Sequence, residues 1–413
     1  MLAIHGWHWG TIVQNKLHRN INLIYGLAFF HSFMIIVPVI VPFFISKGLS
    51  LAEIFYLQAV YASTIVVLEA PSGYFADLFG RRTALLIGSV VHGIGYLCLN
   101  FADDLFSLIV FEIIVGISAS LLSGADLALL YDTQKTLREE GTIDDGKGIA
   151  HLGFIKSSAE GLGALLGGAL ALWSFDILVV VQALAAWMCL ILALGVVEPP
   201  YKKESQGVDH LGIGRILKHL LQGDPLLRKI VIAIPLYSLA TFHVAWLMQP
   251  YWESQGISLS MFGVLWCSQS LVVALASKFG FEIERRHGAA YALTLMGLLP
   301  IVGHFGLAWL QGWAGMGLGL LLCASRGLNQ VILVNALNRR VPSEFRATAN
   351  SFTSFLFRLS FIITGPLVGY VAETEGLGTV LTLLGVSSIA LFAVVMLPLI
   401  QSVKAPAASR CVN

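Results

Sequence analysis

The segment EAPSGYFADLFGRR, residues 69–82, contains two acids, two arginines and two glycines inside an otherwise apolar part of the chain. Long apolar runs surround it, at about residues 52–75 and 83–101. Because a run of about 20 apolar residues is long enough to cross a bilayer as a helix, the segment predicts a tight polar loop between two membrane helices.

The composition supports a membrane protein. The chain has 57% hydrophobic and 12% charged residues, with a mean hydropathy of +0.80, whereas soluble domains have about 25% charged residues. A formal net charge of +1 gives no basic excess for a phosphate backbone, so we predict no nucleic-acid partner. The five cysteines are scattered without a Cys-x-x-Cys pair, which argues against a metal site.

Twelve runs are long and apolar enough to be membrane-spanning helices. They are residues 21–46, 52–75, 83–101, 105–131, 149–173, 176–198, 228–252, 258–281, 289–309, 312–336, 347–372 and 376–401. If the N-terminus is inside, the inner loops and tails collect twenty lysines and arginines and the outer loops only Lys47. This bias predicts that both termini are cytoplasmic.

The longest polar interruption, residues 199–227, divides the chain into two halves, residues 1–198 and 228–413. Apolar residues on one side of residues 211–221 predict an amphipathic helix on the membrane surface. A plain linker is the alternative. A shift of 202 residues superposes Lys156 on Arg358 and Gly163 on Gly365, which is consistent with a duplicated half.

The loop between the second and third spans resembles the signature of the major facilitator superfamily. The matching residues are Gly73, Asp77, Gly80, Arg81 and Arg82. The resemblance implies an all-α membrane protein with twelve transmembrane helices in two pseudo-symmetric halves. It also implies a monomer in the bacterial cytoplasmic (inner) membrane, without enzymatic activity or a cofactor. The segments SGADLALLYD and RRVPSEFRATANS are similar to a poorly characterised bacterial branch usually called permeases.

The resemblance also gives this loop a role as an inner gate. In relatives the equivalent aspartate caps the eleventh helix, and a loop arginine meets an acid at the end of the fourth. Here these contacts imply Asp77 near Arg346 and Arg81 with Asp132. We further expect Gly73 to allow close helix packing and Gly80 to permit the turn. Simple solvation of the loop is the alternative.

Three departures from the family pattern narrow the interpretation. Leu78 stands where a basic residue is usual, and Glu112 precedes Gly116 where many proton-coupled exporters carry an arginine. The fifth span has Gly163 and the Gly167–Gly168 pair but lacks the proline of drug exporters. No phosphate-binding loop of the Gly-x-x-x-x-Gly-Lys type is present in the sequence, so ATP is not the evident energy source.

Ionisable residues within the spans are candidates for function, because burial of charge in a bilayer is expensive. The cations Lys156, Arg326 and Arg358 predict a site for an anionic small-molecule solute. The alternative is internal pairing, of Lys156 with Glu160, or of either arginine with Asp126 or Glu69.

The acids Glu69, Asp126 and Glu160 are candidates for carrying coupling protons, since burial favours the protonated carboxyl. For Glu69 a latch at the inner end is an equal alternative. His31, His243 and His304 are weaker candidates, with packing or helix-to-helix hydrogen bonds as the alternative.

The leading prediction is a secondary transporter that works by alternating access, with export of a metabolite, drug or siderophore-like solute driven by protons. Proton-coupled uptake is one alternative. A membrane sensor that keeps the fold without transporting is an alternative of another class.

Overall fold

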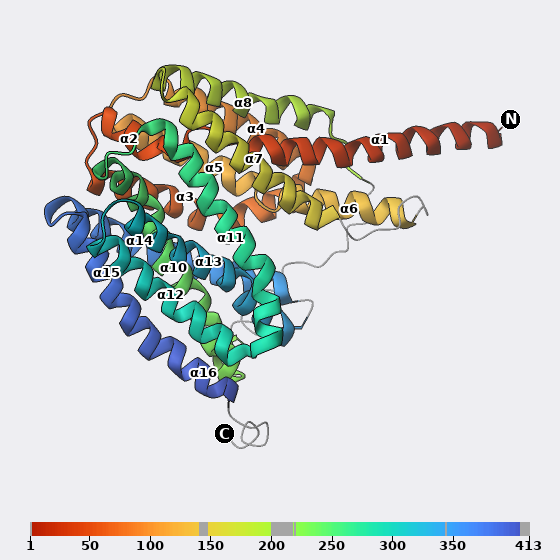
Figure 1. Cartoon of the computed structure of the whole chain (residues 1–413). Coiled ribbons are helices and arrows are strands. Elements are labelled where there is room, and N and C mark those ends of the chain that lie inside the picture. Colours follow the sequence, from red (N-terminus) through yellow and green to blue (C-terminus); the bar gives the residue numbers. More distant parts are fainter. Residues whose placement is uncertain (1, 140–147, 200–217, 219, 343–344, 405–413) are drawn as a thin grey trace. The chain divides into compact units, whose positions relative to one another are not determined.

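The computed structural model describes residues 2–139, 148–199, 218, 220–342 and 345–404 (Figure 1). Every regular element in these residues is a helix, and no strand occurs among them. The prediction of an all-α protein is therefore confirmed. The greater part of the predicted amphipathic surface helix lies outside the described residues.

The chain forms two compact units. Unit 1 comprises Met1–Leu49, Val60–Glu204 and Ser258–Trp266, and unit 2 comprises Ser50–Ala59, Ser205–Ile257 and Cys267–Asn413. Short segments of α3 and α11 are thus grouped with the unit that does not contain the rest of their helix. The division into halves at residues 199–227 stays a prediction.

The helices of the N-terminal part run from the first residue described to the end of α8. They are α1 (Leu2–Ser32), η1 (Val37–Val39), α2 (Ile40–Ser46), α3 (Leu51–Phe79), α4 (Arg81–Leu99), α5 (Leu105–Leu122), α6 (Ala125–Glu139), α7 (Gly148–Leu170) and α8 (Phe175–Gly195).

The helices of the C-terminal part begin after the segment that divides the halves. They are α10 (Pro225–Ser254), α11 (Leu259–His287), α12 (Ala289–Trp309), α13 (Gly312–Arg340), α14 (Arg346–Thr374), α15 (Leu377–Leu391), η3 (Phe392–Met396) and α16 (Leu397–Lys404).

Eleven spans of the described chain are long and apolar enough to cross a membrane. The first joins α1, η1 and α2, the fourth joins α5 and α6, and the last joins α15, η3 and α16. The remaining predicted span, residues 149–173, corresponds to α7. This helix has 23 residues but contains Lys156 and Glu160. These charges lower its hydropathy without shortening the helix, so the twelve-helix architecture holds.

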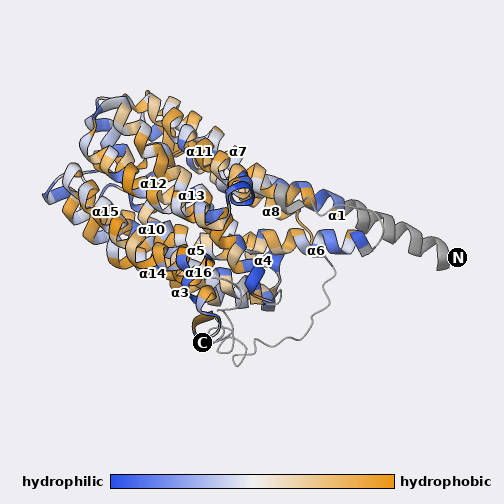
Figure 2. Ribbon diagram, turned by 60° about the horizontal axis from the view of Figure 1, so that its bottom comes forward, coloured by the Kyte–Doolittle hydropathy of each residue, from blue (hydrophilic) through white to orange (hydrophobic). Residues whose placement is uncertain are grey.

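The hydrophobic residues follow the length of the helices in both units, as the colouring in Figure 2 shows. Unit 1 has a core of buried residues around Leu27, Leu85 and Leu129, and unit 2 has one around Ile230 and Leu333. Burial of such side chains stabilises each bundle by contact between helices.

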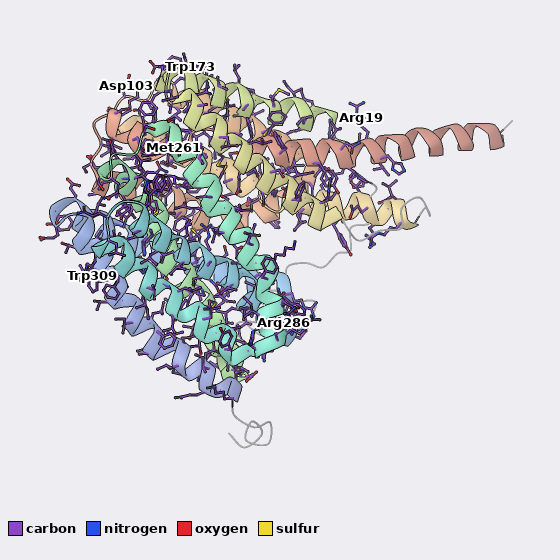
Figure 3. The ribbon with its side chains drawn as sticks, viewed as in Figure 1. Arg19, Asp103, Trp173, Met261, Arg286 and Trp309 are labelled. Carbon is purple, nitrogen blue, oxygen red and sulfur yellow. The ribbon has the colours of Figure 1, made fainter. Side chains whose placement is uncertain are left out.

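Several charged and tryptophan side chains lie at helix ends. In unit 1, Arg19 lies toward one end of the helices, whereas Asp103 and Trp173 lie at the other (Figure 3). In unit 2, Arg286 and Trp309 occupy opposite ends in the same way (Figure 3). At the same end of unit 1 as Asp103, the Ser107 hydroxyl and amide donate to Asp104 and hold the pKa of that carboxyl below its usual range.

Two spans of unit 1 are interrupted in their middle. The first loses its helix between Ser32 and Val37, and the fourth turns at Ser123 and Gly124, where Gly124 has a φ of 84°. Such a φ is readily adopted only by glycine. The sequence predicted both spans as continuous helices over residues 21–46 and 105–131, and these two breaks correct that prediction.

Candidate functional site

The two breaks lie beside a buried ion pair in unit 1. Lys156 of α7 donates from Nζ to Oδ2 of Asp126 over 2.6 Å. The Asp126 side chain is 7% exposed and that of Lys156 is 35% exposed. The carboxylate is therefore enclosed, while about a third of the lysine side chain stays exposed.

The position of Asp126 follows from the turn at Gly124. Because α6 begins at Ala125, Asp126 lies in the first turn of that helix. Its Oδ1 accepts the backbone N–H of Leu127 at 2.7 Å. Both the helix dipole and the free N–H groups of a first turn favour a negative charge, and Asp126 lies where both act.

The break in the first span is held by a glutamine from α8. Oε1 of Gln182 accepts the backbone N–H groups of Ile35, at 2.6 Å, and Ile36, at 3.3 Å. A helix interrupted in an apolar region leaves amides that need such partners. Gly167 of α7 packs directly on the break, since a Cβ at Gly167 would collide with the carbonyl oxygen of Ile35.

Two histidines extend this polar region. The rings of His31 (α1) and His92 (α4) have centroids 5.1 Å apart, and Asp126 and Lys156 both lie within electrostatic reach of His31. His92 is 1% exposed, and neither of its ring nitrogens has a hydrogen-bond partner in the described part of the chain. The site thus combines one ion pair, one histidine pair and two helix breaks.

The structure describes the other predicted candidates within their own units. Lys156 bonds Asp126 on a neighbouring helix rather than Glu160, which is exposed on its own helix; Glu69 is half-buried on α3. In unit 2, Arg358 donates from an Nη to the Ser354 hydroxyl over 3.0 Å. The internal pairing considered for Lys156 therefore exists, but with a different acid.

Arg326 differs from the other two cations. It is exposed on α13, and no hydrogen bond or ion pair joins its guanidinium to another of the described residues. Since Lys156 belongs to unit 1 and both arginines to unit 2, a shared anion site remains a prediction.

The loop between α3 and α4 makes its contacts within unit 1. An Nη of Arg81 donates to the carbonyl oxygen of Ala128 at 2.8 Å and forms an ion pair with Asp132. The contact that the resemblance implied for Arg81 is therefore present. Gly80, with a φ of 93°, makes the turn that starts α4, as expected.

A residue that the sequence analysis missed caps the same helix. The carboxylate of Glu198 accepts the backbone N–H groups of Arg81, at 3.0 Å, and Arg82, at 2.7 Å. An acid at a helix N-terminus satisfies free amides and opposes the helix dipole. Only the close approach of two distant segments gives Glu198 this function, so no local pattern indicated it.

The expectations for Gly73 and Asp77 have different outcomes. A Cβ built on Gly73 would meet no side chain or other helix among the described residues of unit 1 within 4 Å, so the close helix contact expected there is not seen within that unit. Asp77 is exposed in unit 1, and Arg346 of unit 2 donates weakly to the carbonyl oxygen of Val341 at 3.4 Å. Pairing of Asp77 with Arg346 stays a prediction.

Unit 2 contains a second histidine pair in equivalent helices. Nε2 of His243 (α10) lies 2.9 Å from the Thr364 hydroxyl, and Nδ1 of His304 (α12) lies 3.1 Å from the Ser388 hydroxyl. The two histidines are 4% and 0% exposed and lie within electrostatic reach of each other.

A repeat in the sequence could have revealed both pairs. YGLAFFHSFMIIVP at residues 25–38 matches YSLATFHVAWLMQP at residues 237–250 at six positions. These positions are Tyr25, Leu27, Ala28, Phe30, His31 and Pro38. The same shift of 212 residues relates His31 to His243 and His92 to His304. The sequence analysis named His31, His243 and His304 but missed His92, because no pattern in its own segment sets it apart from a packed helix residue.

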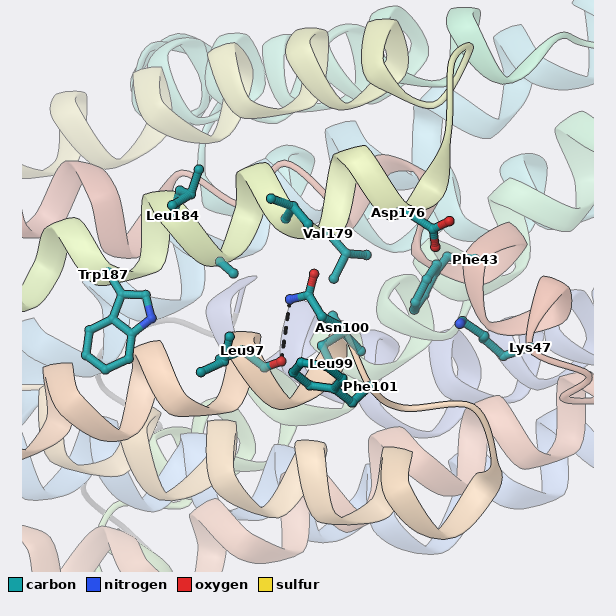
Figure 4. A pocket seen from close by; sticks show the side chains of 12 residues that line it. Phe43, Lys47, Leu97, Leu99, Asn100, Phe101, Asp176, Val179, Leu184 and Trp187 are labelled. Carbon is teal, nitrogen blue, oxygen red and sulfur yellow. Dashed lines mark hydrogen bonds between the residues drawn. The ribbon is translucent and has the colours of Figure 1, made fainter.

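A separate cavity of about 480 Å³ lies between α4 and α8 of unit 1 (Figure 4). Its walls are mostly apolar, with Lys47 and Asp176 at one end and Trp187 toward the other. None of the ionisable residues of the ion pair or the histidine pairs lines it. We therefore place the candidate site at the ion pair rather than in this cavity.

Comparison with known proteins agrees with the sequence resemblance. The model of the Major Facilitator Superfamily matches residues 21–365. The chain belongs to the major facilitator superfamily. Membership makes it a membrane transport protein, and the predicted family is confirmed.

Curated relatives in this superfamily cover most of the chain. The uncharacterized MFS-type transporter STM4428 of Salmonella typhimurium is 25% identical over 406 residues, which are 95% of this chain and 99% of that protein. The uncharacterized MFS-type transporter YxaM of Bacillus subtilis is 22% identical over 84% of this chain and 88% of that protein.

Solved structures of the superfamily share the fold. The nucleoside transporter NupG has a TM-score of 0.74 at 13% identity, covering 94% of this chain and 100% of that chain. The D-xylose-proton symporter has a TM-score of 0.66 at 16% identity, covering 94% and 99%. At these identities the likeness shows the fold alone.

Proposed function

We propose that this protein is a proton-coupled secondary transporter that exports a small organic solute carrying a carboxylate or similar anionic group. It works by alternating access, as a monomer in the bacterial inner membrane with both termini in the cytoplasm. It is not an enzyme and uses no cofactor. The observation that carries the proposal is the Asp126–Lys156 ion pair beside two interrupted spans.

The ion pair is better suited to binding than to stability. Desolvation of two charges offsets most of their attraction, so a buried ion pair is weak evidence for a stabilising role. Helices interrupted at membrane depth are typical of transporter sites, where free backbone groups meet the solute. Because the Lys156 side chain is more exposed than that of its partner, Lys156 has room to turn from Asp126 to an anionic group of the solute.

Unit 2 contains the other two cations of the proposed anion site, Arg326 and Arg358. Arg358 and Arg326 lie on α14 and α13, within predicted spans. In the proposed cycle they contribute to anion binding when the two halves enclose the solute. The Arg81–Asp132 contact belongs to the inner gate and biases the equilibrium between inward-open and outward-open states.

Two alternatives stand beside export. Uptake by proton symport uses the same residues with the opposite direction of net flux. A sensor that does not transport is the alternative of another class, and the persistence of the gate loop and of the intramembrane charges argues against it.

The test is flux into and out of proteoliposomes that contain the purified full-length protein. A panel of carboxylate-bearing and neutral metabolites, drugs and chelators is measured with an imposed pH gradient and a clamped membrane potential. We expect gradient-dependent flux of at least one anionic solute. Flux that persists after collapse of the pH gradient would remove proton coupling, and no flux across the panel would leave the sensor alternative.

The chain offers a matched pair of variants for this assay. Lys156→Met removes the cation of the ion pair, whereas Lys278→Met removes an exposed intramembrane lysine that has no ion pair with another described residue. We expect flux to be lost in the first variant and kept in the second. Equal flux in both would exclude Lys156 from solute binding.

A further inference from the structure

The histidine pair of unit 1 faces charged groups, and that of unit 2 faces hydroxyl groups. His31 lies near both members of the Asp126–Lys156 ion pair, while His243 and His304 contact Thr364 and Ser388. The repeated sequence places the pairs in equivalent helices, so the difference between them lies in their surroundings.

The titratable groups around the unit 1 pair come from several helices. α6 supplies Asp126 and α7 supplies Lys156, both toward His31. On the other side, the His92 ring contacts the ring of Tyr96, with centroids 5.0 Å apart. Around the Tyr96 hydroxyl are Glu112 of α5, Tyr61 of α3 and Cys189 of α8.

His92 has capacity for a hydrogen bond that the described structure does not use. Neither ring nitrogen is bonded to another described residue although the side chain is 1% exposed. An unsatisfied buried polar group is unfavourable, and histidine is the side chain with an unperturbed charge change near neutral pH. This free-energy cost is consistent with a His92 side chain that forms a hydrogen bond in another state of the transport cycle.

We infer that His31 and His92 together bind one proton when Lys156 separates from Asp126. This inference rests on the proposed function, because an anionic solute is what draws Lys156 away. With the ion pair intact, Lys156 neutralises Asp126 and the histidines are neutral. Once Lys156 turns to the solute, the Asp126 carboxylate is left without its cation and attracts a positive charge to the nearest basic group.

The exchange is balanced in charge. The solute brings one negative charge, and a proton from water binds one ring nitrogen of the pair while no covalent bond of the protein or the solute breaks. The rings are 5.1 Å apart, so repulsion between like charges opposes a second proton. Solute and proton therefore bind cooperatively, and linkage requires that each raises the affinity for the other by the same factor. Cooperative binding couples solute and proton in the same direction, so this inference uses the anionic solute of the proposed function but favours uptake by symport, whereas export driven by protons would require the two to compete.

The test requires no solute, because variants reproduce the two charge states of the ion pair. Histidine ring signals are titrated by NMR in full-length protein with isotope-labelled histidine in nanodiscs. Single His→Gln variants assign the signals of the four buried histidines, which are His31, His92, His243 and His304. Lys156→Met leaves Asp126 unpaired, and we expect the proton affinity of the His31–His92 pair to rise at least about tenfold, equivalent to about 1.4 kcal/mol.

Two further variants keep the inference falsifiable if Lys156→Met folds poorly. Asp126→Asn leaves Lys156 facing the histidines and should lower their proton affinity. The double variant Asp126→Asn/Lys156→Met, which is neutral, should give an intermediate value. The His243 and His304 signals, which serve as the internal control, should not move in any of the three.

Unchanged titration of His31 and His92 in the folded variants would overturn the inference, and so would equal shifts in His243 and His304. The outcome is separate from that of the flux assay. Gradient-dependent flux with unchanged titration would refute the histidine site alone, whereas the expected titration without flux for any solute would refute the transport proposal alone.

Discussion

The amide group of Gln182 is predicted to hold the break in the first span, and the substitution Gln182→Leu tests this. Gln182 is 1% exposed, and its Oε1 accepts the amides of Ile35 and Ile36, which are themselves buried. Leucine has a similar volume but accepts no hydrogen bond. The substitution therefore leaves two donors unsatisfied without opening a large cavity.

The magnitude follows from those two contacts. A buried amide without a partner costs about 1–3 kcal/mol, so we assign about 2 kcal/mol to the Ile35 amide and about 1 kcal/mol to the longer contact of Ile36. The apolar surface of leucine returns about 1 kcal/mol. The expected loss in free energy of unfolding is about 2 kcal/mol.

The assay is thermal unfolding in detergent, followed by the reactivity of the Cys189 thiol, which is fully buried in the folded protein. The other four cysteines are replaced so that one signal reports unfolding. Gln330→Leu, at an exposed position of α13, should have almost no effect.

A Gln182→Leu variant that is as stable as the parent protein would refute the assignment of Gln182 to the break. An equal loss in Gln330→Leu would show that the effect arises from the added leucine rather than from the lost hydrogen bonds.

Three other predictions use the same fold. Gly167→Ala should lower the free energy of unfolding by about 2–3 kcal/mol through overpacking. Gly73→Ala has open space at its Cβ and should be neutral or raise that free energy by up to about 1 kcal/mol. Thermal unfolding of the two variants tests this difference. Glu198→Ala should cost about 1 kcal/mol by removing the cap of α4, and unchanged unfolding would exclude the cap. Arg358→Gln should abolish solute binding while Asp77→Asn mainly slows turnover, which equilibrium binding and flux separate; retained binding in the first variant would remove Arg358 from the site.

The sequence was sufficient to predict the helices and the family. Hydropathy places the spans because the bilayer requires a long apolar helix whatever the packing around it. The loop between α3 and α4 could also be predicted from the sequence, because Gly80 and Arg81 belong to a local pattern. Arg81 contacts Asp132 as the resemblance implied.

The site itself depended on contacts that no local pattern contains. Spacing along α7 favoured Glu160 as the partner of Lys156, but the orientation of the helix turns Lys156 toward Asp126. The break in the first span is held by Gln182, which lies 147 residues away from Ile35 in the chain. The histidine repeat was visible in the sequence, yet only the ring contact in the structure joins His31 to His92.

The break in the first span also has a consequence for how the protein could acquire new substrates. Gly167 meets the carbonyl oxygen of Ile35, and Gln182 meets the amides of Ile35 and Ile36. These contacts use main-chain atoms of the break, so the side chains of its own residues are not needed to maintain them. In the proposed transporter, substitutions at the half-buried residues Phe33 and Met34 of the break can change the shape and polarity near the candidate site while the bend stays in place, which makes this segment a natural starting point for directed evolution of specificity.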